Sequence, residues 1–310
     1  NSSIRIQGLD GRYTQILKDG FPVFSGAASG LGLLQTPPLD LKQVEIIKGS
    51  SSTLYGGGAI AGLVNLISKT PEKERDFSIH LNGTTGKGLD VNSFFGQKFN
   101  KVGTTVFASY NRNWAYDPSD VGFTAIPKFD RFVFNPKLFL YLSENTDFNF
   151  GINSMIENRL GGDMEYVKDK GNEEHSYFER NKTQRHSSQL TFEHRFDKQN
   201  RLNVKNSITY FSRKIEIPDF KFDGDQLSSF SEVSYIHTKE KTEWVAGANV
   251  WTDKFTEEKL TDFPLRDYNM TTVGVFVQNN TKITDWMNLE SGLRTDYIND
   301  YGFAVLPRIS

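Results

Sequence analysis

Residues 44–71, VEIIKGSSSTLYGGGAIAGLVNLISKTP, are the stretch of this chain that says most about its fold. The apolar residues of Gln43–Lys48 and Leu63–Ser68 predict two short strands, and the Gly56-Gly57-Gly58 run between them predicts a tight turn. Pro71 ends the pattern because proline cannot donate to a strand ladder. The segment therefore predicts a compact, turn-rich unit that ends near residue 71.

A glycine-rich turn before an apolar segment also invites a nucleotide-binding interpretation. Residues 56–61 match a relaxed G-x-G-x-x-A pattern. That pattern needs a strand before it and a long helix after it. Here a polar stretch, Ser50–Tyr55, precedes the glycines, and a strand-like run follows them. The chain also lacks a Gly-Lys-Ser or Gly-Lys-Thr sequence, which excludes a Walker-type phosphate loop.

Composition narrows the remaining classes of function. The chain has 310 residues, a net charge of −2 and no cysteine. The charge gives no electrostatic reason to expect nucleic acid, and the missing cysteines exclude disulfides and thiolate metal sites. The longest apolar run, Ala59–Val64, is far shorter than the roughly 20 residues of a membrane-spanning helix. Strands of alternating character can cross a membrane without such a run.

The chain divides into two regions of different character. Eleven of its 26 glycines fall within residues 1–71, where a third short strand, Tyr13–Leu17, is also expected. From Phe77 onward the dominant period is two, as in 189–197, where apolar and polar residues alternate. We therefore predict one domain over residues 1–71 and a second, built from antiparallel strands, over residues 72–310.

The turns of the second region decide between a soluble β-sandwich and a membrane barrel. Tight polar turns are expected at 97–102, 143–147, 197–200, 239–241 and 284–286. Long loops are expected at 117–128, 161–181, 218–225 and 254–267. Because the two kinds alternate, all short turns fall at one end of the strands and all long loops at the other, as in outer-membrane barrels. A sandwich is the less favoured alternative.

Signals for catalysis are weak throughout the sequence. There is no Gly-x-Ser-x-Gly, no His-Glu-x-x-His and no cysteine nucleophile, and the five histidines are scattered. Glu173-Glu174-His175 could touch a metal, but adjacent residues rarely complete a coordination shell. We therefore predict no catalytic residue, no metal site, no cofactor and no enzyme activity.

Short motifs in residues 1–71 resemble the plug domain of TonB-dependent outer-membrane receptors. The elements that carry the resemblance occur in the family's order, with Gln7 and Ser50 as departures from its usual residues. They are Ile6-Gln7-Gly8, Leu17-Lys18-Asp19-Gly20, Val44–Gly49, Leu54-Tyr55-Gly56 and Val64–Lys69. The motif residues taken from this match are Gly8, Asp19, Gly20, Glu45, Lys48, Gly49, Tyr55, Gly56 and Asn65. Gly292–Tyr297 and Leu306–Ser310 resemble segments of the family's barrel.

The resemblance implies a fold and a function. The fold is all-β dominated: a transmembrane antiparallel barrel, present as about 11 to 12 of about 22 strands, preceded by part of a small α/β plug. On this basis residues 1–71 are expected to be the carboxyl-terminal part of a plug, and residues 72–310 the first half of a barrel. The implied function is active import of a ferric siderophore, haem or cobalamin across the outer membrane of a Gram-negative bacterium.

The resemblance also implies partners and a ligand region. The expected partners are TonB, engaged through an amino-terminal box that this chain lacks, a metal chelate and outer-membrane lipid, but no nucleic acid. Ligand would lie between the plug's outer loops and the barrel mouth, in a concave site of aromatic and polar groups. The candidate residues are Phe24, Ser25, Gly26, Ala28 and Ser29 in the plug, with Arg112, Trp114, Tyr116, Tyr166 and Tyr177 in the barrel. A non-transporting surface binder or adhesin and a barrel-embedded hydrolase are the alternatives.

Overall fold

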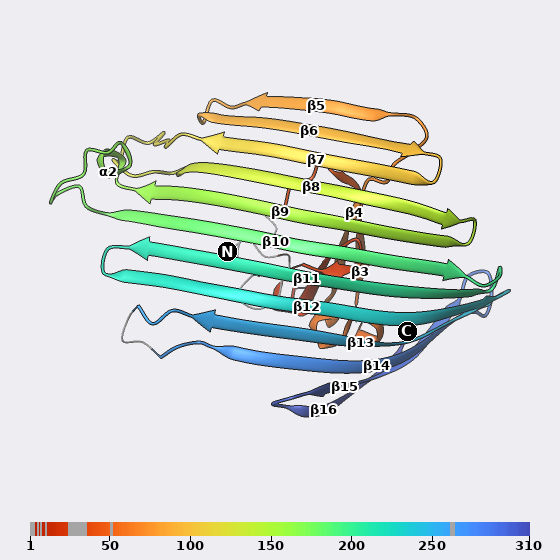
Figure 1. The fold of residues 1–310 in the computed structure, drawn as a ribbon. Helices are drawn as coiled ribbons and strands as arrows, with labels where there is room; N and C mark the ends of the chain where they lie inside the picture. Colours follow the sequence, from red (N-terminus) through yellow and green to blue (C-terminus); the bar gives the residue numbers. More distant parts are fainter. Residues whose placement is uncertain are drawn as a thin grey trace.

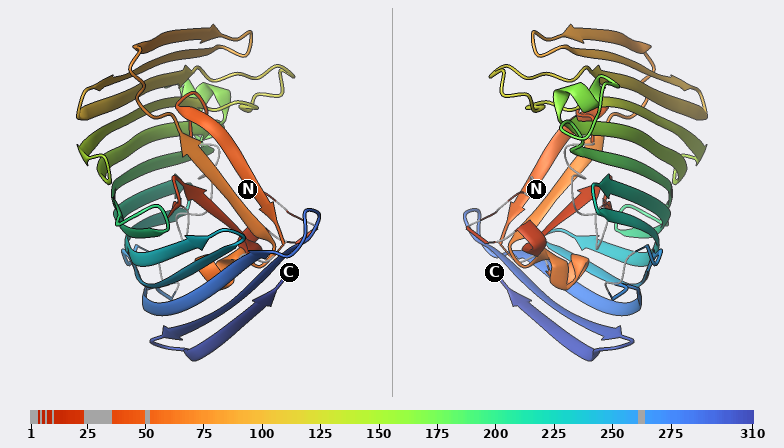
Figure 2. Two further views of the ribbon diagram at one scale, coloured as in Figure 1. Left: turned by 90° about the vertical axis from the view of Figure 1, so that its right-hand side faces the viewer. Right: turned by 90° about the vertical axis from the view of Figure 1, so that its left-hand side faces the viewer.

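The strands of this chain form two sheets. The computed structural model describes residues 4, 6, 8–9, 11–23, 36–49, 52–260 and 264–310. Within them, a four-stranded sheet lies near the amino terminus and a 12-stranded sheet follows it. Figure 1 shows the strands of the larger sheet side by side in chain order, and Figure 2 shows this sheet curved around the smaller one. The predicted barrel wall with a small plug domain is therefore confirmed.

The smaller sheet, which we call the plug sheet, has the order β2-β1-β4-β3. Its strands are β1 (Thr14–Lys18), β2 (Phe21–Pro22), β3 (Leu41–Lys48) and β4 (Gly62–Ser68). β1 runs parallel to β4, and the other pairs are antiparallel. Three of the strands were predicted to within two residues, whereas β2 was not. The short helices η1 (Gly11–Tyr13), α1 (Ser52–Tyr55) and η4 (Gly57–Ala59) complete this unit.

The larger sheet, which we call the wall, pairs each strand with the next one in the chain, always antiparallel. Its first six strands are β5 (Asp76–Gly83), β6 (Gly88–Phe99), β7 (Val102–Asn113), β8 (Lys128–Ser143), β9 (Thr146–Gly162) and β10 (Phe178–Arg195). The last six are β11 (Asn200–Ile217), β12 (Phe220–Lys239), β13 (Thr242–Glu257), β14 (Tyr268–Lys282), β15 (Asn288–Ile298) and β16 (Gly302–Ile309). One further helix, α2 (Met164–Val167), lies between β9 and β10.

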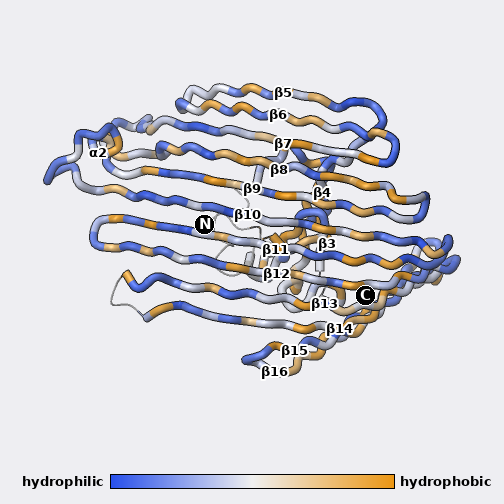
Figure 3. Tube along the Cα trace, in the orientation of Figure 1, coloured by the Kyte–Doolittle hydropathy of each residue, from blue (hydrophilic) through white to orange (hydrophobic). Residues whose placement is uncertain are grey.

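The two faces of the wall have opposite chemistry to those of a soluble sheet. On β14, Val273, Val275 and Val277 face outward and are exposed, whereas inward-facing side chains such as Glu157 and Gln226 are buried. The alternation of apolar and polar residues along each strand is visible in Figure 3. This pattern suits a wall with lipid outside and a filled lumen inside. No helix in the described part of the chain is long and apolar enough to cross a membrane.

The connections of the wall agree with the predicted turns at one end and only partly at the other. Short connections join β6 to β7, β8 to β9, β10 to β11, β12 to β13 and β14 to β15. At the opposite end, 14 residues separate β7 from β8, 15 separate β9 from β10 and ten separate β13 from β14, in agreement with the long loops expected there. The long loop predicted at 218–225 is wrong: Pro218-Asp219 alone forms the turn, and β12 begins at Phe220. Asp219 makes this possible because its short polar side chain tolerates the left-handed backbone it adopts there (φ 63°).

Candidate functional site

The turn between β1 and β2 ties the plug sheet to the wall. Asp19 and Gly20 both have positive φ, at 54° and 77°, as a two-residue hairpin of this type requires. The Asp19 carboxylate accepts hydrogen bonds from the backbone N–H of Ser68 (2.7 Å) and from its hydroxyl (2.9 Å). It also forms an ion pair with the ammonium of Lys137 on β8. The Asp-Gly motif therefore sets the turn and anchors it.

Charges around Asp19 keep it ionised inside the protein. Burial disfavours the charged carboxylate, but the Lys137 ammonium, the hydrogen bonds from Lys137 and Ser68, and the Lys18 charge outweigh burial. Together they hold the pKa of Asp19 below its ordinary value of 3.8. The Asp19 carboxylate is therefore charged where it pairs with Lys137.

Three other motif residues hold the plug sheet together. The Asn65 side-chain oxygen accepts from the backbone N–H of Gly20 (3.0 Å), and its amide donates to Glu45 (3.2 Å). Beside them, the Lys18 ammonium pairs with Asp40 at 2.8 Å, and Asn135 of the wall donates to the same carboxylate at 3.0 Å. These contacts give the family motif a structural reason, since each joins two elements that are far apart in the chain.

A second contact between plug and wall lies at the glycine-rich turn. Arg294 on β15 is almost fully buried and pairs with Asp296 at 2.7 Å. Its guanidinium also donates to Asn249 (2.9 Å) and, at the outer limit of distance, to the carbonyl of Leu54 in α1 (3.5 Å). Gly56 lies beside this arginine, and its left-handed backbone (φ 78°) is the conformation that favours glycine there.

The remaining motif residues take up turns or line a cavity. Gly8 (φ 78°) and Gly49 (φ 88°) have left-handed backbones, and the Gly49 N–H donates to the Ala61 carbonyl at 3.1 Å. Lys48 ends β3 on an exposed stretch. Tyr55 lines a cavity between plug and wall, where burial and the nearby Glu232 and Glu45 carboxylates raise the pKa of its phenol. The tyrosine therefore stays protonated and can donate a hydrogen bond.

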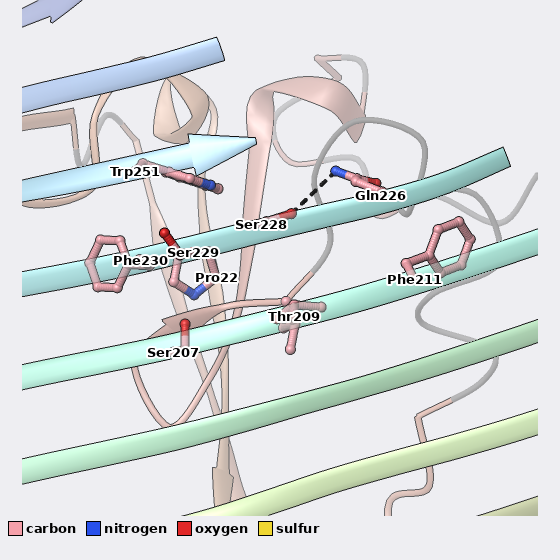
Figure 4. Close-up of a pocket in the computed structure, with 10 residues that line it drawn as sticks. Pro22, Ser207, Thr209, Phe211, Gln226, Ser228, Ser229, Phe230 and Trp251 are labelled. Carbon is pink, nitrogen blue, oxygen red and sulfur yellow. Dashed lines mark hydrogen bonds between the residues drawn. The ribbon is translucent and has the colours of Figure 1, made fainter. Parts of the chain in front are cut away.

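Cavities lined by both polar and apolar side chains lie between the plug sheet and the wall. One of about 180 Å³ lies between Tyr55 and Lys205, Glu232 and Trp251 of the wall. Another of about 210 Å³ is bounded by Asp19, Lys137, Gln189 and Thr191. A smaller one, shown in Figure 4, is enclosed by Pro22 of β2 and side chains of β11, β12 and β13. The interface is thus incompletely packed, and its lining groups can hydrogen-bond water or a solute.

The predicted barrel residues fall into two groups on the long loops. Arg112, at the end of β7, lies over the Trp114 ring (4.9 Å) and near Asp130 (3.6 Å). Tyr116 lies apart from them, bridged to Ile126, with the Lys87 ammonium 6.0 Å from its ring. The structure therefore brings Arg112 and Trp114 together, but does not place Tyr116 in the same contact.

Tyr166 and Tyr177 belong to the other group, in the loop between β9 and β10. The Tyr166 ring stacks on Phe178 with centroids 4.6 Å apart, and Tyr177 lies 6.1 Å from Phe123 of the preceding long loop. Asp163 caps α2 through the N–H groups of Glu165 and Tyr166 and contacts His175 Nδ1 at 2.8 Å. That hydrogen bond and the charge of Asp163 raise the pKa of His175, while the hydrogen bonds from His175 and from the Glu165 and Tyr166 N–H groups lower the pKa of Asp163.

Some predicted residues cannot be placed, and others were missed. Phe24, Ser25, Gly26, Ala28 and Ser29 lie outside the described residues. Lys137, Asn135 and Gln189, which contact the plug, were not predicted as site residues. Their polar character at inward-facing positions of a barrel strand was the available signal. Over the described ranges, no group of three or more histidine, aspartate or glutamate side chains could hold a metal ion.

Comparison with known proteins identifies the first of the two units. Residues 1–63 match the family model described as TonB-dependent Receptor Plug Domain. The chain carries a TonB-dependent receptor plug. Over 65 residues it is also 32% identical to the vitamin B12 transporter BtuB of Vibrio vulnificus, a match that covers 21% of this chain and 11% of the transporter. The predicted resemblance is therefore confirmed.

Solved structures extend the likeness in fold from the plug to the wall. The siderophore receptor PirA of Acinetobacter baumannii superposes with a TM-score of 0.74 at 18% identity, over 98% of this chain and 51% of PirA. PirA of Pseudomonas aeruginosa gives 0.71 at 18% identity, over 98% and 52%. The ferric enterobactin receptor PfeA of P. aeruginosa gives 0.70 at 16% identity, over 96% and 51%. The chain spans about half the length of these receptors, and at such identities the likeness shows the fold alone.

Proposed function

We propose that this chain is part of a TonB-dependent outer-membrane receptor that imports a metal chelate, with a ferric siderophore as the first candidate. The observation that carries the proposal is a plug held inside a barrel wall by polar contacts. Asp19–Lys137, Asn135–Asp40 and Arg294–Leu54 join the two units by ion pairs and hydrogen bonds. Such contacts position a plug domain across the lumen of the barrel, as a receptor that controls passage through the barrel requires.

The chemistry of the interface supports movement of the plug. An apolar socket would hold a plug by burial, at a cost that grows with every square ångström exposed. Polar groups instead exchange their partners for water when the two surfaces separate. The cavities beside Tyr55 and Lys137 already leave space for such exchange. Energy for the movement would come from TonB in the periplasm.

Uptake tests the proposal in the complete receptor. A strain that lacks the gene should fail to accumulate one iron or cobalamin chelate, and the wild-type gene should restore accumulation only in cells with functional TonB. Unchanged uptake of every metal chelate in the deletion strain would contradict import. Binding of a chelate without TonB-dependent uptake would favour a surface binder or adhesin instead.

A reversible crosslink shows whether import passes the plug. The Cβ of Thr53 in α1 lies 3.1 Å from the position a Cβ would take at Gly292 on β15. Disulfides need about 3.8 Å between these atoms, so a small adjustment would allow one. Thr53→Cys/Gly292→Cys should block uptake when oxidised and recover it on reduction. Each single variant is the matched control and should stay active under both conditions.

A further inference from the structure

Basic side chains gather on the outer face of the wall, near the long-loop end of β10 to β13. They lie on the same side of these strands as exposed apolar residues such as Ile208, Leu227 and Val250, and so they point away from the plug. Lys182 on β10 and Lys214 on β11 pair in register and are both exposed. The whole group is Arg180, Lys182, Lys214, Lys221 and Lys254.

Negative charge on this part of the face is smaller, and every carboxylate there has a partner. The pairs are Glu216 with Arg180 and Lys221 (3.2 and 3.0 Å), Asp223 with Lys214 (2.5 Å), and Asp225 with the Tyr210 hydroxyl (2.9 Å). Five basic groups therefore face three carboxylates. Among the residues that the structure describes, Lys182 and Lys254 have no carboxylate partner. The excess positive charge can attract an anion to this face.

Polar side chains follow the lysines toward the middle of the wall. On β10 the outward positions after Lys182 are Gln184, His186 and Ser188, and the apolar stretch begins only at Leu190. Successive outward positions are about 7 Å apart. In the part of the chain that the structure describes, the Gln184 and Ser188 side chains make no hydrogen bond. Unpaired polar groups on a lipid-facing wall cost free energy, so these positions suit a neighbour that can hydrogen-bond.

Apolar side chains flank this polar row on both sides. Ile156 and Ile152 on β9 pair in register with Gln184 and Ser188, and Ser188 pairs with Ile208 on β11. The three isoleucines are exposed. From the long-loop end inward, the surface thus offers positive charge, then hydrogen-bonding groups, then hydrocarbon. A membrane lipid presents its phosphate, its polar headgroup backbone and its acyl chains in the same order.

We propose that the outer face around Lys182 and Lys214 binds an anionic lipid of the outer leaflet through its phosphate. The inference rests on the outer-membrane location in the proposed function, but not on the solute imported. Ammonium groups at a membrane surface attract lipid phosphates. Gln184 and Ser188 supply hydrogen bonds to the headgroup, and the acyl chains lie on the isoleucines. A soluble acidic partner would use the lysines but not the polar groups that continue into the apolar face.

Lipid binding by the complete receptor in nonionic detergent tests this site. The probes are diphosphoryl and monophosphoryl lipid A, which differ in phosphate number, and native mass spectrometry counts the bound lipid. We expect the diphosphoryl probe to bind more tightly and its affinity to fall as salt rises. Lys182→Gln should weaken that probe about fivefold, because one lysine near the surface is lost. Lys182→Arg keeps the charge and should keep the affinity.

A matched control separates this site from general attraction to positive charge. Lys198 is also exposed, but it lies in the short β10–β11 turn at the opposite end of the same strands. Lys198→Gln should leave binding of both probes unchanged, and unaltered heat-dependent migration on gels would show that each variant folds. Equal affinity for the two probes, an equal loss in Lys198→Gln, or a receptor dimer that covers this face and excludes both lipids would overturn the site. Chelate uptake in cells is a separate readout, so the import proposal can stand or fall independently of this one.

Discussion

Replacement of Asp19 by Asn should loosen the plug in the wall. The substitution removes the negative charge but keeps a residue that tolerates the left-handed backbone of this turn (φ 54°). Loss of one partner from a buried ion pair costs about 3–5 kcal/mol. Because the Lys137 and Asp19 side chains keep 13% and 23% of their surface exposed, we expect about 2 kcal/mol. That free energy corresponds to a roughly 30-fold larger open population.

Cysteine labelling can measure this open population directly. The 310 residues contain no cysteine, so a single Thr53→Cys places one thiol in the plug. Thr53 is fully buried beside Gly292 of the wall and can react with a maleimide only when the plug separates from the wall. The labelling rate of the Asp19→Asn receptor should rise about 30-fold in the same detergent. Asp219→Asn is the matched control, because Asp219 also has a positive φ but lies in the β11–β12 turn.

Acid provides a second check on the same pair. The pKa of Asp19 is lowered in the folded protein, so its stabilising contribution is complete above the ordinary pKa of 3.8 and is lost as pH falls through the lowered pKa. The difference in labelling between wild type and Asp19→Asn should therefore shrink below pH 3.8. A double-mutant cycle with Lys137→Met should show coupling. Additive effects, or an unchanged labelling rate in Asp19→Asn, would refute the anchor.

Three further predictions concern the loop, the interface and the outer face. The His175–Asp163 contact should stabilise the α2 loop in a pH-dependent way, because the pKa of His175 is raised: the stabilisation is complete below pH 6.5 and is lost as pH rises through the raised pKa. His175→Gln should abolish this dependence. The ratio of wild-type to variant proteolysis rates from pH 6 to 9 measures it. Gly292→Val should destabilise the contact between plug and wall by about 1–3 kcal/mol and so raise the rate of cysteine labelling, because a Cβ there would lie 2.6 Å from a plug side chain. Gly83→Val, with open space around it, should leave the labelling rate unchanged. Val275→Arg on the exposed outer face should impair assembly into lipid by about 2–4 kcal/mol, whereas Val275→Leu should be neutral, as measured by heat-dependent gel migration.

The plug sheet shows what local sequence can predict. The strands before and after the glycine-rich segment were found from their apolar pattern, and Asp19-Gly20 from its turn chemistry. β2 was missed because two residues carry no periodic signal. The polar stretch before the glycines became the helix α1, which owes its position to packing against the wall. Such a tertiary contact has no trace in a window of a few residues.

The wall shows a different limit. The alternation of apolar and polar residues predicted antiparallel strands. It did not predict where each strand ends, because residues typical of turns can also lie within a strand. Residues 218–225 contain Pro, Gly and three aspartates, which are typical of a loop. They nevertheless pair through most of their length, because Phe220 and Phe222 continue the inward apolar positions of Ile215 and Ile217 across a two-residue turn. Pairing of the inward apolar side chains on the two strands therefore outweighed the local propensity of these residues to form a loop.

Pairs between plug and wall were beyond prediction for a simpler reason. Asp19 and Lys137 are 118 residues apart, and the register that brings them together depends on every hairpin between them. Sequence could have selected Lys137 as an inward-facing cation, but not its partner.

The inverted faces of the wall link the fold to the proposed function. The wall is apolar outside, and its inner face is mostly polar apart from a cluster of Phe94, Phe107, Val133 and Met155, so charges and hydrogen bonds make the contacts to the plug described above. Such contacts specify position more than they add stability, because desolvation offsets most of their gain. The plug can therefore be placed accurately and still be displaced at modest cost.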